Sequence, residues 1–362
     1  MEKMDDKNWE NIPSPIEYEK ELRRIRRNLR KRSALLVLTS LVLAAALLFA
    51  AVRYAVPALE SLYWDPRTVS YGTEAGTDLD MVLAAYTDLF CPTTYFEGTL
   101  VGHTGFASYS ISVMTLDETT NEKQVSYGSL EKGELFIPYG VWDTVPHTHV
   151  GDYWIQANQY DPKIIEINRK FTIEILSPLP EYIQVAAYIT FTEDKTLTET
   201  FRFRDELANA KHDPYNDTGY LWTAIRHTDK VDNSARCGFS YSSLTNQFPE
   251  ANEVYPAFSE WQAYEDRNIC YEQWSTKEQT YTAHFKSLLK FMDDQLKNGT
   301  GFPAPAIGEV DMEYYANALD YVEENGVMAY GCYIIASPQH LLEIMEREDV
   351  LYVQLDGGWL YI

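Results

Sequence analysis

Cysteine and basic residues are both scarce in this sequence. Four cysteines in 362 residues are too few to build a fold from disulfides. Lysine and arginine total 30 against 54 aspartates and glutamates, which gives a formal net charge of −24. A chain this acidic is repelled by phosphate backbones. We therefore expect no direct binding to nucleic acid.

The catalytic and cofactor motifs are incomplete. Ser129, in a polar turn-like stretch, and Ser287, expected on the outward side of a helix, each begin an S-x-x-K pattern. The companion S-D-N and K-T-G elements are missing. His147 and His149 have no H-E-x-x-H motif or further Cys/His cluster beside them, and the glycines of 299–301 lack the third glycine of a dinucleotide fingerprint. These absences predict that the protein is no enzyme and has neither cofactor nor metal site.

One long apolar run does occur, in residues 34–52 (ALLVLTSLVLAAALLFAAV), which contain no charge, proline or glycine. As a helix this run would be about 28 Å long, close to the thickness of a bilayer core. We predict a transmembrane helix over residues 34–56. The alternative is a cleaved signal peptide, whose apolar region would be about 7 to 15 residues long and preceded by a shorter charged region.

The charge on the two sides of this run differs in sign. Residues 1–33 hold ten basic and seven acidic residues, whereas residues 57–362 hold 19 basic and 47 acidic residues. Positive charge is retained on the cytoplasmic side of a membrane. The sequence therefore predicts a single-pass protein of the cell membrane with a cytoplasmic amino terminus and an extracellular remainder. The residues expected to determine this topology are Arg23, Arg24, Arg26, Arg27, Arg30, Lys31 and Arg32.

The short cytoplasmic segment, residues 1–33, has two interpretations. After a polar lead, a helix is expected to begin after Pro15, and Leu22, Ile25 and Leu29 then form one narrow apolar stripe among arginines. The basic residues suit a juxtamembrane segment that attracts anionic lipid. The stripe, helped by Trp9, suits a helix that docks into a groove of a cytosolic protein.

The remaining sequence predicts a mixed α+β region, β-rich over residues 57–177 and with a smaller α/β layer within residues 178–362. Alternating and β-branched runs predict strands at 106–114, 134–139, 170–176, 182–191, 220–227 and 328–336. Helical spacing and capping residues predict helices at 79–90, 282–298, 311–325 and 339–347. Residues 350–355 and 359–362 are expected to be two strands joined by a turn at 356–358.

Three stretches together resemble a known family. They are ELRRIRRNLRKRSALLVLTSLVL; LPEYIQVAAYITFTEDKTLTE with LWTAIRH; and SLLKFM with YVEENGVMAYGCYIIASPQHLLEIMEREDVLYVQLDGG. They resemble membrane-anchored anti-sigma factors of Gram-positive bacteria that carry sigma-factor-regulator N-terminal and C-terminal domains. The resemblance implies that the inner segment holds an extracytoplasmic-function sigma factor, alone or with a second small membrane protein. It also implies that the outer region senses an envelope condition.

Other functions stay open at this point. A cell-envelope binding domain with a simple membrane anchor is the first alternative, and an exported hydrolase is the second. Because an exterior location is oxidising, Cys91, Cys237, Cys270 and Cys332 could pair in three ways as two disulfides. Cys332 lies in a predicted buried strand and could equally remain a free thiol.

Overall fold

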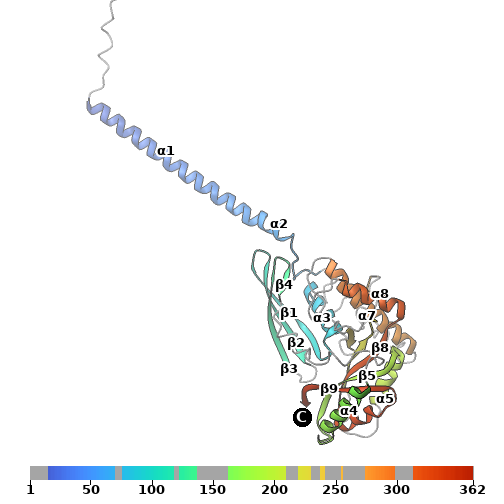
Figure 1. Cartoon of the computed structure of the whole chain (residues 1–362). Helices are drawn as coiled ribbons and strands as arrows, with labels where there is room; N and C mark the ends of the chain where they lie inside the picture. The colour runs from blue at the N-terminus through green and yellow to red at the C-terminus, as the bar shows by residue number, and fades with distance from the viewer. Residues whose placement is uncertain are drawn as a thin grey trace, which may run out of the picture. The chain divides into compact units, whose positions relative to one another are not determined.

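The computed structural model describes residues 15–69, 76–117, 122–136, 162–208, 219–229, 237–240, 254–255, 274–297 and 313–361. These residues form two units, Met1–Tyr63 and Trp64–Ile362, and most of their elements are labelled in Figure 1.

The described part of the first unit is one run of helix over residues 15–60, followed by a short turn. Helix α1 (Pro15–Ala50) begins at the predicted proline and passes through a π-helical turn, η1 (Ala51–Ala55), into α2 (Val56–Glu60). Pro57 explains the turn, because its ring would collide with the carbonyl four residues earlier in a regular α-helix. Tyr18–Glu60 is long and apolar enough to cross a membrane, and none of its most apolar stretch is buried within the protein.

The second unit begins with a helix packed against a meander of strands. Helix α3 (Asp78–Phe90) starts at a capping box in which Thr77 and Asp80 bond each other's backbone N–H groups. The sheet has the antiparallel order β1-β2-β3-β4. Its strands are β1 (Thr94–Gly105), β2 (Ser108–Asp117), β3 (Glu122–Glu131) and β4 (Glu134–Phe136).

A second antiparallel sheet has the order β7-β6-β8-β5-β9. Its strands are β5 (Gln184–Thr196), β6 (Gly219–Ile225), β7 (Cys237–Ser240), β8 (Met328–Ala336) and β9 (Val350–Tyr361). The accompanying helices are α4 (Pro162–Leu176), α5 (Leu197–Ala208), α7 (Trp274–Lys297), α8 (Tyr314–Asn325) and α9 (Pro338–Met345).

One hydrophobic cluster joins these elements. It includes Phe96 and Ile111 from the first sheet, Ile189 from the second, and Leu79 and Phe285 from helices α3 and α7. Residues from both sides of position 177 therefore share a core. The predicted boundary between residues 57–177 and 178–362 remains a prediction.

Several predicted elements are confirmed. Strand β8 has the predicted limits, and α3 differs from its prediction by one residue. Helix α9 begins where Ser337 accepts a bond from the His340 N–H, with Pro338 at the first helical position. The mixed α/β character of the second unit is likewise as expected.

The strand predicted at residues 170–176 is wrong, because these residues form the second half of α4. The sequence KFTIEIL alternates as a strand would. In the structure Phe171 is 62% exposed, whereas Thr172 and Leu176, one helical turn apart, are buried. The helical spacing of the longer segment therefore overrides the local β-propensity.

The turn predicted at residues 356–358 is also wrong. Val185 pairs with Leu360 and Ala187 with Leu355, so β9 advances five residues while β5 advances two. The glycines thus sit in a bulge within one strand, where glycine's conformational freedom is equally useful. Helix α5 was not predicted at all.

Candidate functional site

The basic half of α1 exposes an apolar stripe. Ile25 and Leu29 are 54% and 57% exposed, and Leu22 is partly exposed. On a helix these three side chains lie within one narrow arc. The structure therefore brings together three of the four predicted partner-binding residues. Trp9 lies outside the described residues.

The predicted topology residues surround this stripe. Within the described part of α1, Arg23 pairs with Glu19 at 3.2 Å, and no other member of the set from Arg24 to Arg32 forms an ion pair. Those side chains are exposed. Such a surface can bind an acidic partner around an apolar groove, or the headgroups of anionic lipid.

The serine candidates lie in unrelated places. Ser129 is in strand β3, opposite Phe136 of β4, rather than in a turn. Ser287 is 2% exposed, so the prediction that it points outward is wrong. Core residues flank Ser287 along α7. The buried face of this helix is therefore wide enough to include the Ser287 side chain. The lysine of its S-x-x-K pattern, Lys290, is engaged with Asp294 at 2.7 Å.

The predicted histidine pair, His147 and His149, lies outside the described residues, as do the glycines of 299–301. Among the residues that the structure describes, no group of three His, Cys, Asp or Glu side chains could hold a metal ion.

Three cysteines are buried free thiols: Cys91, Cys237 and Cys332. Two disulfides would need all four cysteines, so that alternative is wrong, and Cys270 lies outside the described residues. Burial raises the pKa of the Cys91 and Cys237 thiols well above the ordinary value. Because the thiolate is the reactive form, both side chains behave as small apolar groups.

A buried polar centre at the end of α3 was missed from the sequence. Asp88 Oδ2 lies 3.1 Å from His284 Nε2, and Asp88 Oδ1 accepts the Ser240 N–H at 2.8 Å. The carbonyl of Asp88 accepts the Trp222 indole N–H at 2.8 Å. These bonds tie α3 to α7, β7 and β6. An aspartate among the apolar residues of a buried helix was the available sign in the sequence.

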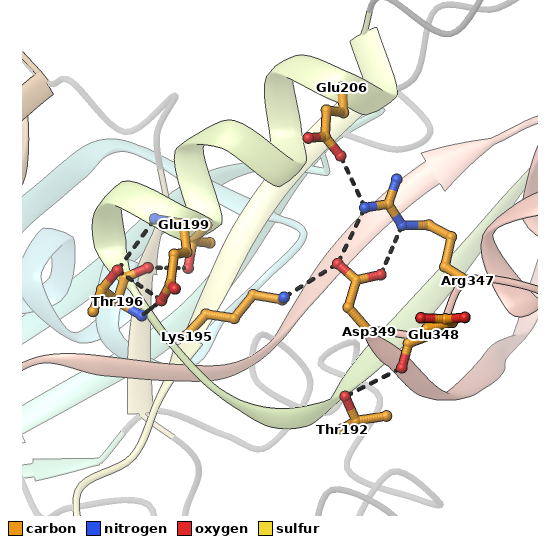
Figure 2. Close-up of polar contacts among 9 residues, drawn as sticks. Thr192, Lys195, Thr196, Glu199, Glu206, Arg347, Glu348 and Asp349 are labelled. Atoms are coloured by element: carbon orange, nitrogen blue, oxygen red, sulfur yellow. Dashed lines mark hydrogen bonds and ion pairs between the residues drawn. The ribbon is translucent and has the colours of Figure 1, made fainter.

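A second polar network joins α5, the end of β5 and the turn before β9 (Figure 2). Asp349 accepts two bonds from Arg347, at 2.8 and 3.1 Å, and one from Lys195 at 3.1 Å. Arg347 also bonds Glu206 at 2.8 Å. Burial alone would raise the pKa of the Asp349 carboxyl, but the bonds from Arg347 and Lys195 outweigh burial and lower this pKa.

A separate set of bonds starts α5 at the residue that follows Lys195 (Figure 2). Thr196 and Glu199 form a reciprocal capping box, in which the Glu199 carboxylate accepts the Thr196 N–H at 2.8 Å. That backbone bond, followed by the bond from the Thr196 hydroxyl, lowers the pKa of Glu199. Arg347 and Lys195 thus pair with Asp349 and Glu206, and Thr196 holds Glu199, which suits a structural clamp.

No family model matches the chain, and neither the curated proteins nor the solved structures contain a match.

Proposed function

We propose that this protein is a single-pass transmembrane regulator that holds an extracytoplasmic-function sigma factor at the membrane. In this proposal residues 1–33 bind the sigma factor in the cytoplasm, alone or with a second small membrane protein. The apolar half of α1 crosses the bilayer, and the second unit responds to an envelope condition outside.

The observation that supports this proposal is the composition of α1. A single helix joins an exposed, arginine-flanked stripe directly to an apolar stretch that buries none of its surface in the protein. The apolar stretch needs a lipid phase, and the basic segment sets which end remains in the cytoplasm. The short inner segment can act only by contact.

Mass action is sufficient for such a regulator. A sigma factor bound at the membrane cannot engage RNA polymerase. An outer event releases it only if the regulator has two states that bind the sigma factor with different affinities. The acidic outer region and the basic inner segment are separated by the helix, so a stimulus and a partner can act on different parts of the chain.

The test is co-purification of sigma factors with the full-length protein from its own cells. Leu22→Ser, Ile25→Ser and Leu29→Ser together remove the apolar stripe and retain every basic residue, and we expect them to abolish capture. The matched control is Ile16→Ser, the same kind of change at an exposed apolar residue of α1 that lies off the stripe; capture should persist. Failure of the unmodified chain to capture any sigma factor would contradict the proposal.

Three further observations distinguish the alternatives. If the protein is an envelope binding domain with a simple anchor, replacing the stripe changes no phenotype of the cell. If the apolar run is a cleaved signal peptide, mature protein begins after it, which mass spectrometry of the purified chain would show. If the protein is a hydrolase, it has a hydrolytic activity, and replacing Ser129, Ser287, His147 and His149 abolishes that activity.

A further inference from the structure

Helices α7 and α8 border an open groove in the second unit that no proposed role has yet used. Its volume is about 680 Å³, within the range of small-molecule sites. One side of it is a ridge of α7 from Glu278 to Lys290, and Leu319 and Glu323 of α8 form the other side together with Val254.

The charged groups of this groove are unequally engaged. Lys290 is neutralised by Asp294, 2.7 Å away. Lys286, by contrast, is partly buried and forms no ion pair or hydrogen bond within the part of the chain that the structure describes. Glu278 accepts a hydrogen bond from the Thr198 hydroxyl and pairs with no cation there. Glu323, exposed on α8, likewise forms no ion pair or hydrogen bond among the described residues. The groove thus has one uncompensated cation, Lys286, and two uncompensated carboxylates, of which Glu278 lies on the same helix as the cation.

These two charges are separated along one helix. Eight residues at 1.5 Å per residue place Lys286 about 12 Å along the axis from Glu278. Between them lie the polar side chains of Gln279 and Thr282, which make no hydrogen bond among the described residues, and the apolar side chain of Ala283.

A ligand with one charge does not fit this arrangement. A simple anion would be repelled by Glu278, by Glu323 and by the excess of acidic residues in residues 57–362. A simple cation would leave Lys286 unpaired. A free amino acid carries both charges but is much shorter than 12 Å. An extended peptide spans about 3.3 to 3.6 Å per residue, so about three residues cover the separation.

We infer that the groove between α7 and α8 binds a short zwitterionic peptide of about three residues. Its ammonium group lies at Glu278 and its carboxylate at Lys286. The amide groups of the peptide bond Gln279 and Thr282, and its side chains contact Ala283, Leu319 and Val254. This inference concerns only peptide affinity, so it stands or fails independently of sigma-factor capture.

Isothermal titration of the full chain in detergent micelles tests it with trialanine, N-acetyl-trialanine, trialanine amide and free alanine as probes. We expect trialanine to bind most tightly. Blocking either end removes one charge-assisted bond and should weaken binding about tenfold. No measurable binding of trialanine at millimolar concentration, or equal binding of all four probes, would overturn the inference.

Two variants assign the ends. Lys286→Gln should abolish the difference between trialanine and its amide, and Glu278→Gln the difference between trialanine and its acetylated form. Lys170→Gln, on the exposed face of α4, is the matched control and should preserve both differences. Ala283→Phe fills the groove without touching either charge and should abolish binding, with the thermal midpoint recorded to show that the chain still folds. Retention of both differences in both charge variants would contradict the assignment.

Discussion

Helices α1 and α7 are both long and rich in leucine, but they present their apolar side chains in opposite ways. In α1, Leu36, Leu48 and Phe49 are 67%, 68% and 69% exposed. In α7, Phe285, Leu288 and Leu289 are fully buried. The apolar residues of α7 recur on one face, whereas those of α1 surround the axis.

This difference teaches where each unit obtains its stability. The Trp64–Ile362 unit buries its apolar surface internally, so its folding should be measurable in ordinary buffer. The apolar half of α1 buries nothing within the described chain, so we propose that the bilayer supplies the apolar phase. Four changes should separate the two, beginning with the largest effect.

Two charges at the centre of the apolar run should remove the protein from the membrane. Val42→Asp with Ala45→Asp costs about 6 kcal/mol, because each charge near the centre of a spanning helix costs about 3 kcal/mol. Flotation of membranes on a density gradient measures the result. Val42→Leu with Ala45→Leu is the control and should float like the unmodified protein. Unchanged flotation of the charged variant would show that α1 is no membrane anchor.

A side chain at Gly331 should destabilise the second unit and leave the membrane association proposed for α1 unchanged. A Cβ there would lie 2.3 Å from the carbonyl oxygen of Ile189 in the neighbouring strand β5. Gly331→Val should therefore lower the free energy of unfolding by about 3 kcal/mol or more, measured by urea and near-ultraviolet circular dichroism. Gly219→Ala meets only ordinary contacts, and a comparable loss in that variant would refute the steric explanation.

The clamp at Asp349 should make the second unit sensitive to acid. Its pKa is lowered in the folded state, so its contribution is present above the unfolded pKa of about 3.9 and is lost as pH falls through the lower folded pKa. We expect about 1 kcal/mol. Asp349→Asn should flatten the dependence of unfolding free energy on pH below about pH 5. Glu174→Gln, an exposed change without an ion pair in the described residues, should leave the slope unaltered.

An effect no larger than that of Asp349 is expected at the start of α5. Thr196→Ala removes the capping box and should lower the free energy of unfolding by about 1 kcal/mol. Thr192→Ala removes only a 3.4 Å bond to the Glu348 carbonyl and should cost less. If urea titrations give the two variants an equal loss of unfolding free energy, the capping box adds no stability beyond that of an ordinary long hydrogen bond.

The sequence predicted best the elements whose hydrophobic periodicity agrees with the residues that start and end them. Strand β8 is a continuous apolar run after Asn325-Gly326, and Ser337-Pro338 both ends it and starts α9. It predicted poorly where two periods compete, as in the second half of α4. The sequence also predicted the wrong structure at the bulge of β9. A glycine pair suits a turn and a bulge equally well, and only the pairing of β9 with β5 decides which of the two forms.

The candidate site was partly accessible from the sequence for a similar reason. The stripe of Leu22, Ile25 and Leu29 is local, so helical spacing was enough to find it. The groove brings α7 together with α8 and Val254, and the bonds around Asp88 join α3 to β6, β7 and α7, so both depend on segments far apart in the chain. Side chains such as Ser287 were misplaced because the width of a buried face depends on what packs against it.

The orientation of α1 in the membrane can be measured directly. An epitope inserted at Lys132-Gly133, in the turn between β3 and β4, and a second placed before Pro15 can be labelled with antibodies in intact and permeabilised cells. If the amino terminus is cytoplasmic and the second unit lies outside, the first epitope is labelled in intact cells and the second only after permeabilisation. Labelling of the amino-terminal epitope in intact cells, with protection of the other, would contradict it.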